Sequence, residues 1–269
     1  MDSEEEEDFG LKPGSVIESS HAKYTIDKLL GEGGFGAVYR VHDSNNPTME
    51  YALKVERKLE TRKDSKLKME IAILKLVSME RAEKSHFTKI IDRGKKEKFF
   101  FLVMQLVGKS LADLKALRPH KVFSMHTGLG ASIQCLEAVE DLHKHGFIHR
   151  DLKPANYATG LGAQIRCIYI LDFGIARRIL NDKGLPWRKI SDKNEVMRMK
   201  EESRMNRDKL LYGMKCKEEF GKILEYIDSL HYEDRVDYSY IYELLKTSSV
   251  ICDCKLTDPY DWEETARKK

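Results

Sequence analysis

The stretch HRDLKPAN, residues 149–156, decides how this sequence is interpreted. It places a carboxylate, an ammonium group and an amide at Asp151, Lys153 and Asn156. A second short motif, DFG at residues 172–174, follows a β-rich run and adds another carboxylate. Side chains of these types in this order are typical of a site where a phosphoryl group is transferred and metal ions neutralise its charge.

We predict a separate role for each of these side chains. Asp151 is placed to accept the proton of a substrate hydroxyl, and Lys153 to steady the transferred phosphoryl group. Asn156 and Asp172 are predicted to hold magnesium. The predicted catalytic residues are therefore Asp151, Lys153 and Asn156, and the predicted metal ligands are Asn156 and Asp172.

Upstream, residues 31–38 read GEGGFGAV and contain the pattern G-x-G-x-x-G. Dinucleotide-binding folds use the same glycines, but there a helix follows, whereas residues 37–41 (AVYRV) predict a strand. Taken alone, the stretch is also compatible with a plain glycine-rich hairpin. Lys54 on the next strand can reach nucleotide phosphates, and Glu70 on the following helix is a suitable counter-ion. Taken singly, each could instead be an ordinary surface charge.

Together these motifs predict a site for ATP and Mg²⁺. Val38 and Ala52 would pack on the adenine, with Met104 behind it and residues 105–107 offering backbone hydrogen bonds. The predicted nucleotide-binding residues are Leu30, Gly31, Gly33, Gly34, Phe35, Gly36, Val38, Ala52, Lys54, Glu70, Met104, Gln105 and Leu106.

The remaining pattern predicts an α+β protein in which a β-rich first part with one helix is followed by a mostly helical part. Strands are expected near residues 24–29, 37–41, 51–55, 89–92 and 99–104, with a helix between the third and fourth. A long helix should begin at the N-cap Ser124 and end at His145, with Gly146 as its stop signal. We predict an acidic flexible tail (1–21), a β-rich lobe and hinge (22–107), a helical lobe (108–264) and a basic tail (265–269).

Several stretches resemble the casein kinase 1 superfamily. They are VMQLVGKSLADL (103–114), LKMEIAIL (67–74), LPWRKISDK (185–193) and DPYDWEE (258–264), and the tau-tubulin kinase branch is the nearest match. The resemblance runs from about Tyr24 to Trp262. It implies a bilobal, protein-kinase-like fold and a serine/threonine protein kinase whose substrates are cytoskeletal, acidic or phosphorylated proteins.

The resemblance is interrupted after the DFG motif. Residues 175–184 (IARRILNDKG) lead directly into Leu185, whereas the family pattern would supply some fifty to sixty further residues, an activation segment and a buried helix. Three interpretations follow: an active kinase in which the gap is compensated, a pseudokinase that binds nucleotide or a partner, and a splice form or gene model that lacks an exon. The helical lobe is expected to be incomplete.

Composition sets the remaining expectations for this chain of 269 residues. Its formal net charge is only +3, which does not suggest a nucleic-acid binder. Five scattered cysteines fit a reduced, intracellular protein. No apolar run reaches the roughly 20 residues that cross a bilayer. We expect a monomer in the cytoplasm, and also in the nucleus, that binds neither nucleic acid nor membrane.

Overall fold

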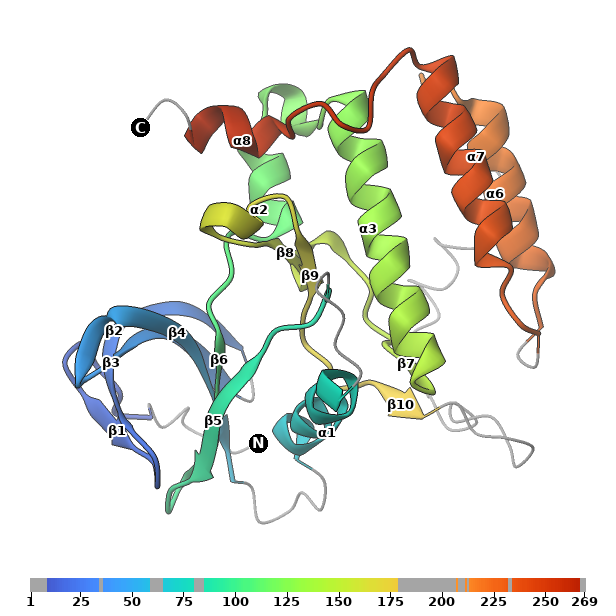
Figure 1. Ribbon diagram of the computed structural model, residues 1–269. Helices are drawn as coiled ribbons and strands as arrows, with labels where there is room; N and C mark the ends of the chain where they lie inside the picture. The colour runs from blue at the N-terminus through green and yellow to red at the C-terminus, as the bar shows by residue number, and fades with distance from the viewer. Residues whose placement is uncertain are drawn as a thin grey trace, which may run out of the picture. The chain divides into compact units, whose positions relative to one another are not determined.

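Figure 1 shows the computed structural model, which describes residues 9–33, 36–58, 65–79, 85–178, 207, 211, 213–231 and 234–266. The chain divides into two compact units. One contains Met1–Leu111 with Phe147–Ala176, and the other contains Ala112–Gly146 with Arg177–Lys269. The predicted α+β class, with a β-sheet part followed by a helical part, is confirmed.

A six-stranded antiparallel sheet forms the centre of the first unit, in the order β1-β2-β3-β4-β6-β5. Side chains alternate between its two faces, so that Ala37, Tyr39 and Val41 are all buried in one core. Strands β2, β3 and β4, which include the first three predicted strands, form an antiparallel meander. The strands are β1 (Val16–Glu18), β2 (Lys23–Gly33), β3 (Gly36–Asp43), β4 (Asn46–Arg57), β5 (Ile90–Lys95) and β6 (Phe99–Gln105).

Residues 9–18 differ from the flexible tail that the sequence predicts. Strand β1 pairs with β2, and Ile17 is only 2% exposed. Phe9 and Leu11 pack against the same core. Residues 1–21 are polar overall because they begin with an acidic run, and the few apolar side chains among them do not form a clear strand pattern. This explains why the sequence did not predict β1.

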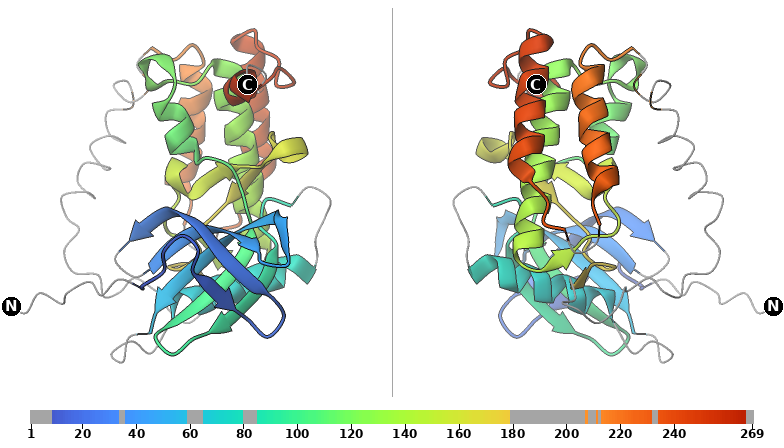
Figure 2. Two further views of the ribbon diagram at one scale, coloured as in Figure 1. Left: turned by 90° about the vertical axis from the view of Figure 1, so that its left-hand side faces the viewer. Right: turned by 90° about the vertical axis from the view of Figure 1, so that its right-hand side faces the viewer.

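Helix α1 (Lys66–Met79) contacts β4, β5 and β6 and lies on one face of the sheet (Figures 1 and 2). Its buried apolar residues include Ile73, Leu74 and Val77, whereas Ile71 is half-buried. Glu70 is 3% exposed, so its side chain faces the core side of the helix.

A later segment completes the first unit. It contains β7 (Phe147–Ile148), the short 3-10 helices η2 (Pro154–Asn156) and η3 (Gly162–Gln164), and the hairpin of β8 (Tyr157–Thr159) with β9 (Ile168–Ile170). Backbone hydrogen bonds join it to the segments around the sheet, from Gly108 N–H to the Thr159 carbonyl (2.7 Å) and from Ile170 N–H to the His86 carbonyl (2.9 Å). These bonds place both motifs, residues 149–156 and 172–174, in the same unit as the glycine-rich strand.

The second unit is mostly helical. Helix α7 packs against both α3 and α6, and Leu129, Ile223, Ile241 and Leu245 form their shared core (Figure 2). The elements are α2 (Leu111–Ala116), η1 (Pro119–Lys121), α3 (Met125–Lys144), β10 (Arg177–Arg178), α6 (Lys217–Ser229), α7 (Tyr238–Ile251) and α8 (Asp261–Ala266).

The predicted ends of the long helix are confirmed. Ser124 is the N-cap of α3, and its hydroxyl accepts a hydrogen bond from the Thr127 N–H. His145 is the C-cap, and Gly146 follows with a φ of +78°, a left-handed conformation that glycine adopts without strain. Asp261, which is 4% exposed, accepts a hydrogen bond from Ser124 N–H at 2.7 Å and thereby joins α8 to the start of α3.

One histidine of α3, His143, is expected to make the stability of the protein depend on pH. The Tyr238 hydroxyl lies 2.6 Å from His143 Nδ1 and can donate to it only when the ring is neutral, and burial lowers the pKa of His143. The unfolded chain therefore binds a proton more readily than the folded one as pH falls below about 6.5, the ordinary histidine pKa. We expect a lower urea midpoint at pH 5.5 than at pH 7.5.

The control for this pH effect is a histidine without such burial. His143→Phe should reduce the difference between the two midpoints, whereas His21→Gln, at an exposed position, should leave it unchanged. Equal differences in the wild type and His143→Phe would contradict the assignment.

All five cysteines are free thiols. Within the described ranges, no group of three or more His, Cys, Asp and Glu side chains is arranged to hold a metal ion. Across the same residues, every helix is too short or too polar to span a bilayer.

Candidate active site

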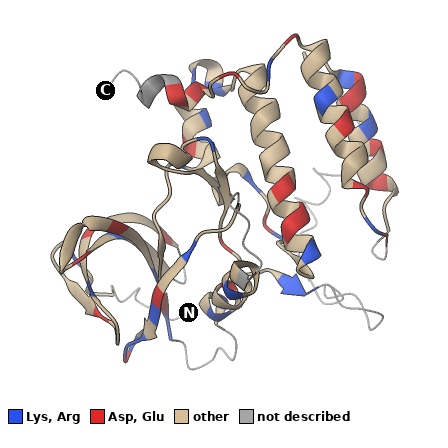
Figure 3. Ribbon diagram, viewed as in Figure 1, with Lys and Arg blue, Asp and Glu red and all other residues tan. Residues whose placement is uncertain are grey.

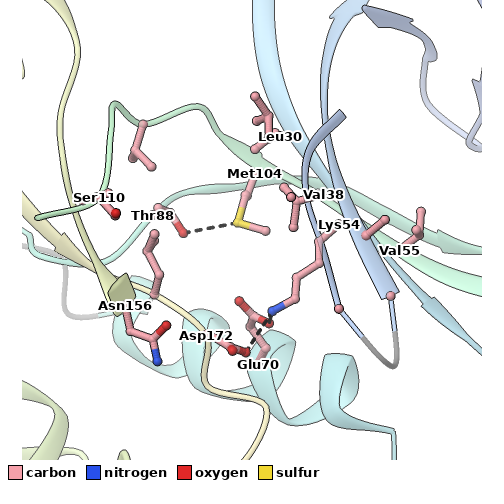
Figure 4. Close-up of a pocket in the computed structure, with 18 of the residues that line it drawn as sticks. Leu30, Val38, Lys54, Val55, Glu70, Thr88, Met104, Ser110, Asn156 and Asp172 are labelled. Atoms are coloured by element: carbon pink, nitrogen blue, oxygen red, sulfur yellow. Dashed lines mark hydrogen bonds and ion pairs between the residues drawn. The ribbon is translucent and has the colours of Figure 1, made fainter. Parts of the chain in front are cut away.

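A cavity of about 670 Å³ opens beside the sheet of the first unit (Figure 4). It brings together residues that the sequence assigns to the nucleotide and the metal. Those that line it are Leu30, Gly31, Gly33, Gly36, Val38, Ala52, Lys54, Glu70, Met104, Gln105, Leu106, Asn156 and Asp172. Gly34 and Phe35 lie outside the described residues. Asp151 and Lys153 are not among the lining residues, but they lie next to Asn156, as described below.

The cavity has an apolar end and a charged end. Leu30, Val38 and Met104 lie toward one end in Figure 4, and Lys54, Glu70 and Asp172 lie together at the other. Such a division suits a ligand with an aromatic base and a polyphosphate. The arrangement therefore fits ATP.

Sequence reasoning missed several lining residues. Thr88 donates its hydroxyl to Met104 Sδ at 3.7 Å, and Leu171 and Ala158 also line the cavity. None of them belongs to a recognisable motif. Ala158 and Leu171 reach the cavity because the β8–β9 hairpin is hydrogen-bonded to the segments around the sheet, a tertiary contact that no local sequence pattern indicates.

Lys54 joins two carboxylates that are far apart in the sequence. Its Nζ donates to Glu70 Oε2 at 2.6 Å and to Asp172 Oδ1 at 3.0 Å. Burial alone would lower the pKa of Lys54, but the charges of Glu70 and Asp172 outweigh it and raise that pKa. Lys54 is therefore a fixed cation at the charged end of the cavity.

The two carboxylates respond differently to this cation. Glu70 is almost fully buried, and burial raises its pKa despite the opposing effect of Lys54. Burial also tends to raise the pKa of Asp172, but the Lys54 ammonium lowers the pKa of this carboxyl overall. Asp172 is thus held as an anion, the form that binds a hard cation such as Mg²⁺.

A buried glutamate that the sequence analysis did not single out sets the position of α1. Glu56 on β4 is 6% exposed, and its carboxylate accepts hydrogen bonds from the Ser65 hydroxyl and the Lys66 N–H, each at 3.0 Å, and from the Leu67 N–H. It caps the first turn of the helix that carries Glu70. Lys54 and Glu56 both lie on β4. This strand therefore carries the lysine and, through Glu56, also fixes the helix that carries its counter-ion Glu70.

We expect Glu56→Ala to destabilise the protein by about 1.5–3 kcal/mol, since hydrogen bonds to a buried charge have this magnitude. The loss should appear as a lower urea midpoint and as a weaker ATP-induced thermal shift, because α1 is no longer held. Glu56→Gln keeps one acceptor oxygen and should have a smaller effect. A full effect from Gln equal to that from Ala would argue that Glu56 acts by charge alone.

The three predicted catalytic side chains meet in one small cluster. Lys153 Nζ lies 2.7 Å from Asp151 Oδ2, and Asn156 Nδ2 donates to the same oxygen at 3.0 Å and to the Asp151 carbonyl at 2.8 Å. Burial would raise the pKa of Asp151, but the hydrogen bonds from Lys153 and Asn156 lower it overall. Asp151 is therefore a carboxylate at neutral pH, able to accept a proton in the transition state.

The amide of Asn156 has a fixed orientation. Since its nitrogen donates to Asp151, its oxygen is the atom turned toward the cavity, as Figure 4 shows. The Asn156 amide oxygen and the Asp172 carboxylate are together a suitable pair of ligands for Mg²⁺.

His149 supports both motifs in a neutral form. Asp151 N–H donates to its Nδ1 at 3.3 Å, so its Nε2 carries the hydrogen and donates to the Leu171 carbonyl at 2.9 Å. Burial lowers the pKa of His149. Its ring packs on Phe173, which is 1% exposed and also stacks on Phe87 at a centroid distance of 5.8 Å.

The backbone is strained at both motifs. Arg150 and Asp172 have φ angles of +72° and +64°, a left-handed conformation that is costly for residues other than glycine. Such conformations persist only where the surroundings impose them, and they cluster at functional sites. Here the buried Phe173 and the bond between His149 and Leu171 fix the chain on either side of Asp172.

The glycines of β2 and β3 differ in how much space a side chain would have at each position. A Cβ atom at Gly36 would lie 2.0 Å from the Val55 carbonyl oxygen, so the close pairing of β3 with β4 requires glycine there. A Cβ at Gly31 or Gly33 would meet no atom within 4 Å, although both residues line the cavity. The absence of side chains at these two positions leaves room for phosphates next to backbone N–H groups, which is the fit that ATP requires.

Comparison with known families agrees with this geometry. Residues 24–198 match the family described as protein kinase domain. This range includes every residue that lines the cavity and both motifs.

Individual relatives are also named as kinases. A *Caenorhabditis elegans* protein named as a serine/threonine-protein kinase is 30% identical over an aligned length of 312 residues, covering 96% of this chain and 86% of that protein. A *Dictyostelium discoideum* protein named likewise is 26% identical over 306 residues, covering 96% of this chain and 59% of that protein. A *C. elegans* protein named as a casein kinase I is 34% identical over 182 residues, covering 66% of this chain and 51% of that protein. The chain thus spans little more than half the length of two of these relatives.

Proposed function

Because the chain belongs to the protein kinase family, we propose that it transfers the γ-phosphate of ATP to serine or threonine hydroxyls of proteins. The observation that carries the proposal is the bridging lysine. Lys54 binds both Glu70 on α1 and Asp172 of the DFG motif, in a cavity that also contains Asn156. This arrangement supplies a cation for the phosphates and two ligands for a metal ion.

Each side chain has a role in this proposal. Lys54 and the N–H groups near Gly31 and Gly33 hold the phosphates, and Asn156 and Asp172 hold Mg²⁺, which when bound neutralises phosphate charge. Asp151 accepts the proton of the substrate hydroxyl, and Lys153, 2.7 Å from it, is within reach of the transferred group. Most of the rate enhancement would come from positioning and from fixed charges.

We further propose a place within the casein kinase 1 superfamily, near the tau-tubulin kinase branch. The sequence stretches quoted above and the similarity to a protein named as a casein kinase I support this placement. On this basis the substrates would be acidic, phosphorylated or cytoskeletal proteins.

The internal deletion is likewise a proposal, and the aligned lengths support it. The alignment with the first *C. elegans* relative is 312 residues long, but 96% of this chain is only about 258 residues. The relative therefore has at least about fifty residues for which this chain has no counterpart. A gap of this size is close to the fifty to sixty residues that the family pattern places after the DFG motif.

Two measurements test the proposed function separately. A thermal melt with and without Mg·ATP reports on the cavity, and transfer of labelled phosphate to an acidic protein reports on catalysis. We expect a higher Tm with Mg·ATP and transfer to serine or threonine. A higher Tm without any transfer would support a nucleotide-binding pseudokinase instead, and an unchanged Tm would reject both.

A further inference from the structure

Two basic stretches that are far apart in the sequence meet at one end of the sheet. Lys58 N–H donates to the Lys98 carbonyl at 2.9 Å, and Lys58 Nζ donates to the Lys96 carbonyl at 2.5 Å. Figure 3 shows the blue segments at the end of β5 and at the start of α1. We call this surface the basic end of the sheet. Its residues are Arg57, Lys58, Lys68, Lys95, Lys96 and Lys98.

Two of these lysines contact one aromatic ring. The ammonium groups of Lys58 and Lys68 lie 5.1 and 5.0 Å from the centroid of the Phe100 ring. Lys95 is the strand partner of Phe100, so its side chain leaves the sheet on the same face. Since the first two cations lie about 5 Å from one point, they are within about 10 Å of each other, which is about one Debye length, and they repel. An anion placed between them would relieve this repulsion.

Among the described residues, the acidic groups at this end do not cancel the charge. The Glu56 carboxylate is occupied by the first turn of α1, and Glu18 forms its ion pair with Lys23 at 2.5 Å. Glu97, in the turn between β5 and β6, is exposed and is a single charge among several lysines.

The start of the chain is anchored at this same end. The Phe9 ring packs edge-on against Phe99 at a centroid distance of 6.0 Å, and the Arg57 guanidinium lies over Phe9 at 5.1 Å. Strand pairing places Arg57 opposite Phe99. Phe9, the first described residue of the chain, therefore lies at the basic end of the sheet.

The residues that precede Phe9 are of the opposite charge. Residues 2–8 read DSEEEED, with six acidic side chains in seven positions. Seven residues can extend over roughly 23 Å, enough to cross the end of a sheet from the Phe99 face to the Phe100 face. Their attachment at Phe9 also gives them a high effective concentration at the surface.

We propose that residues 2–8 dock on the basic end of the sheet, and that this surface is a binding site for acidic peptide segments. The chain's own acidic segment occupies the site and competes with acidic segments of other proteins. This inference does not depend on phosphoryl transfer. It assigns a partner to Lys68, which lies on α1 two residues before Glu70.

The first test uses a fluorescent peptide with the sequence of residues 2–8. Its affinity is measured for the full chain and for a full-length variant whose six acidic residues are replaced by Asn or Gln. We expect the neutral variant to bind the peptide about tenfold more tightly or better, because its own segment no longer competes. The binding should weaken as salt is raised. Equal affinities, or no binding to either protein, would overturn the proposal.

The second test locates the site. In the neutral variant, Lys58→Gln, Lys68→Gln and Lys95→Gln together should abolish peptide binding. A matched control replaces three exposed lysines elsewhere, Lys28, Lys222 and Lys246, by Gln and should leave it unchanged. Equal losses in the two triple variants would show a general effect of net charge and overturn the assignment.

A third measurement examines the unaltered chain. Carbodiimide joins a carboxylate to an amine, with loss of water, only where they are in contact. We expect cross-links within one chain from residues 2–8 to Lys58, Lys68, Lys95 or Lys96, at a yield independent of protein concentration. Cross-links spread evenly over all lysines, or found only between chains, would contradict intramolecular docking.

Discussion

Asp151→Asn is expected to lower kcat for phosphoryl transfer by about 10²–10⁴-fold, the range typical for the loss of a general base. The replacement has the same shape, and its amide oxygen can still accept the hydrogen bond that Asn156 Nδ2 now donates to Asp151 at 3.0 Å. The change therefore removes the proton acceptor and leaves the cluster in place. The measurement is the initial rate of labelled phosphate transfer at saturating ATP.

Nucleotide binding serves as the control for this variant. Asp151 is not among the residues that line the cavity, so the Tm increase caused by Mg·ATP should match that of the wild type. Transfer that persists in Asp151→Asn would remove Asp151 from the mechanism. A lost thermal shift would instead show that the substitution damages the cavity.

Much of the site was predictable because its residues lie in motifs whose spacing is fixed by local structure. Lys54 and Glu70 are only sixteen residues apart, on a strand and the next helix, and the predicted pair is present at 2.6 Å. The strand pattern and the N-cap Ser124 could be predicted for the same reason, since alternation and capping depend on neighbouring residues.

Features that depend on tertiary contacts could not be predicted in this way. Glu56 caps α1 from a different element, nine to eleven residues away, so no capping motif marks it. Strand β1 is only three residues long and follows a strongly acidic stretch. The two basic stretches that form the basic end of the sheet are far apart in the sequence, and only the pairing of β4 with β6 brings them together.

The proposed deletion would follow the DFG motif, and residues 179–206 lie outside the described ranges. The cavity, the bridging lysine and both motifs consist of residues before 177, so the proposed nucleotide site is formed by described residues that precede this stretch. Binding of ATP and binding of a protein substrate are therefore separable questions for this chain.

Lys54→Met should have the largest combined effect on activity and stability. Removal of one fixed charge that stabilises the transferred group typically costs about 10²–10³-fold in rate. The same change leaves Glu70, 3% exposed, without its counter-ion, and breaking a buried ion pair costs about 3–5 kcal/mol. We expect a lower urea midpoint and no thermal shift with Mg·ATP. Lys28→Met, at an exposed position on β2, is the matched control and should change neither.

The two effects of Lys54→Met can be separated by a second substitution at Glu70. In Lys54→Met/Glu70→Gln no buried carboxylate is left unpaired, so most of the stability should return while the activity stays low. In the single variant the stability deficit should also shrink as pH falls, because burial raises the pKa of Glu70 and the folded protein then takes up a proton more readily than the unfolded chain. A double variant that recovers activity along with stability would show that Lys54 serves only to position α1, and that the phosphates are held by other groups.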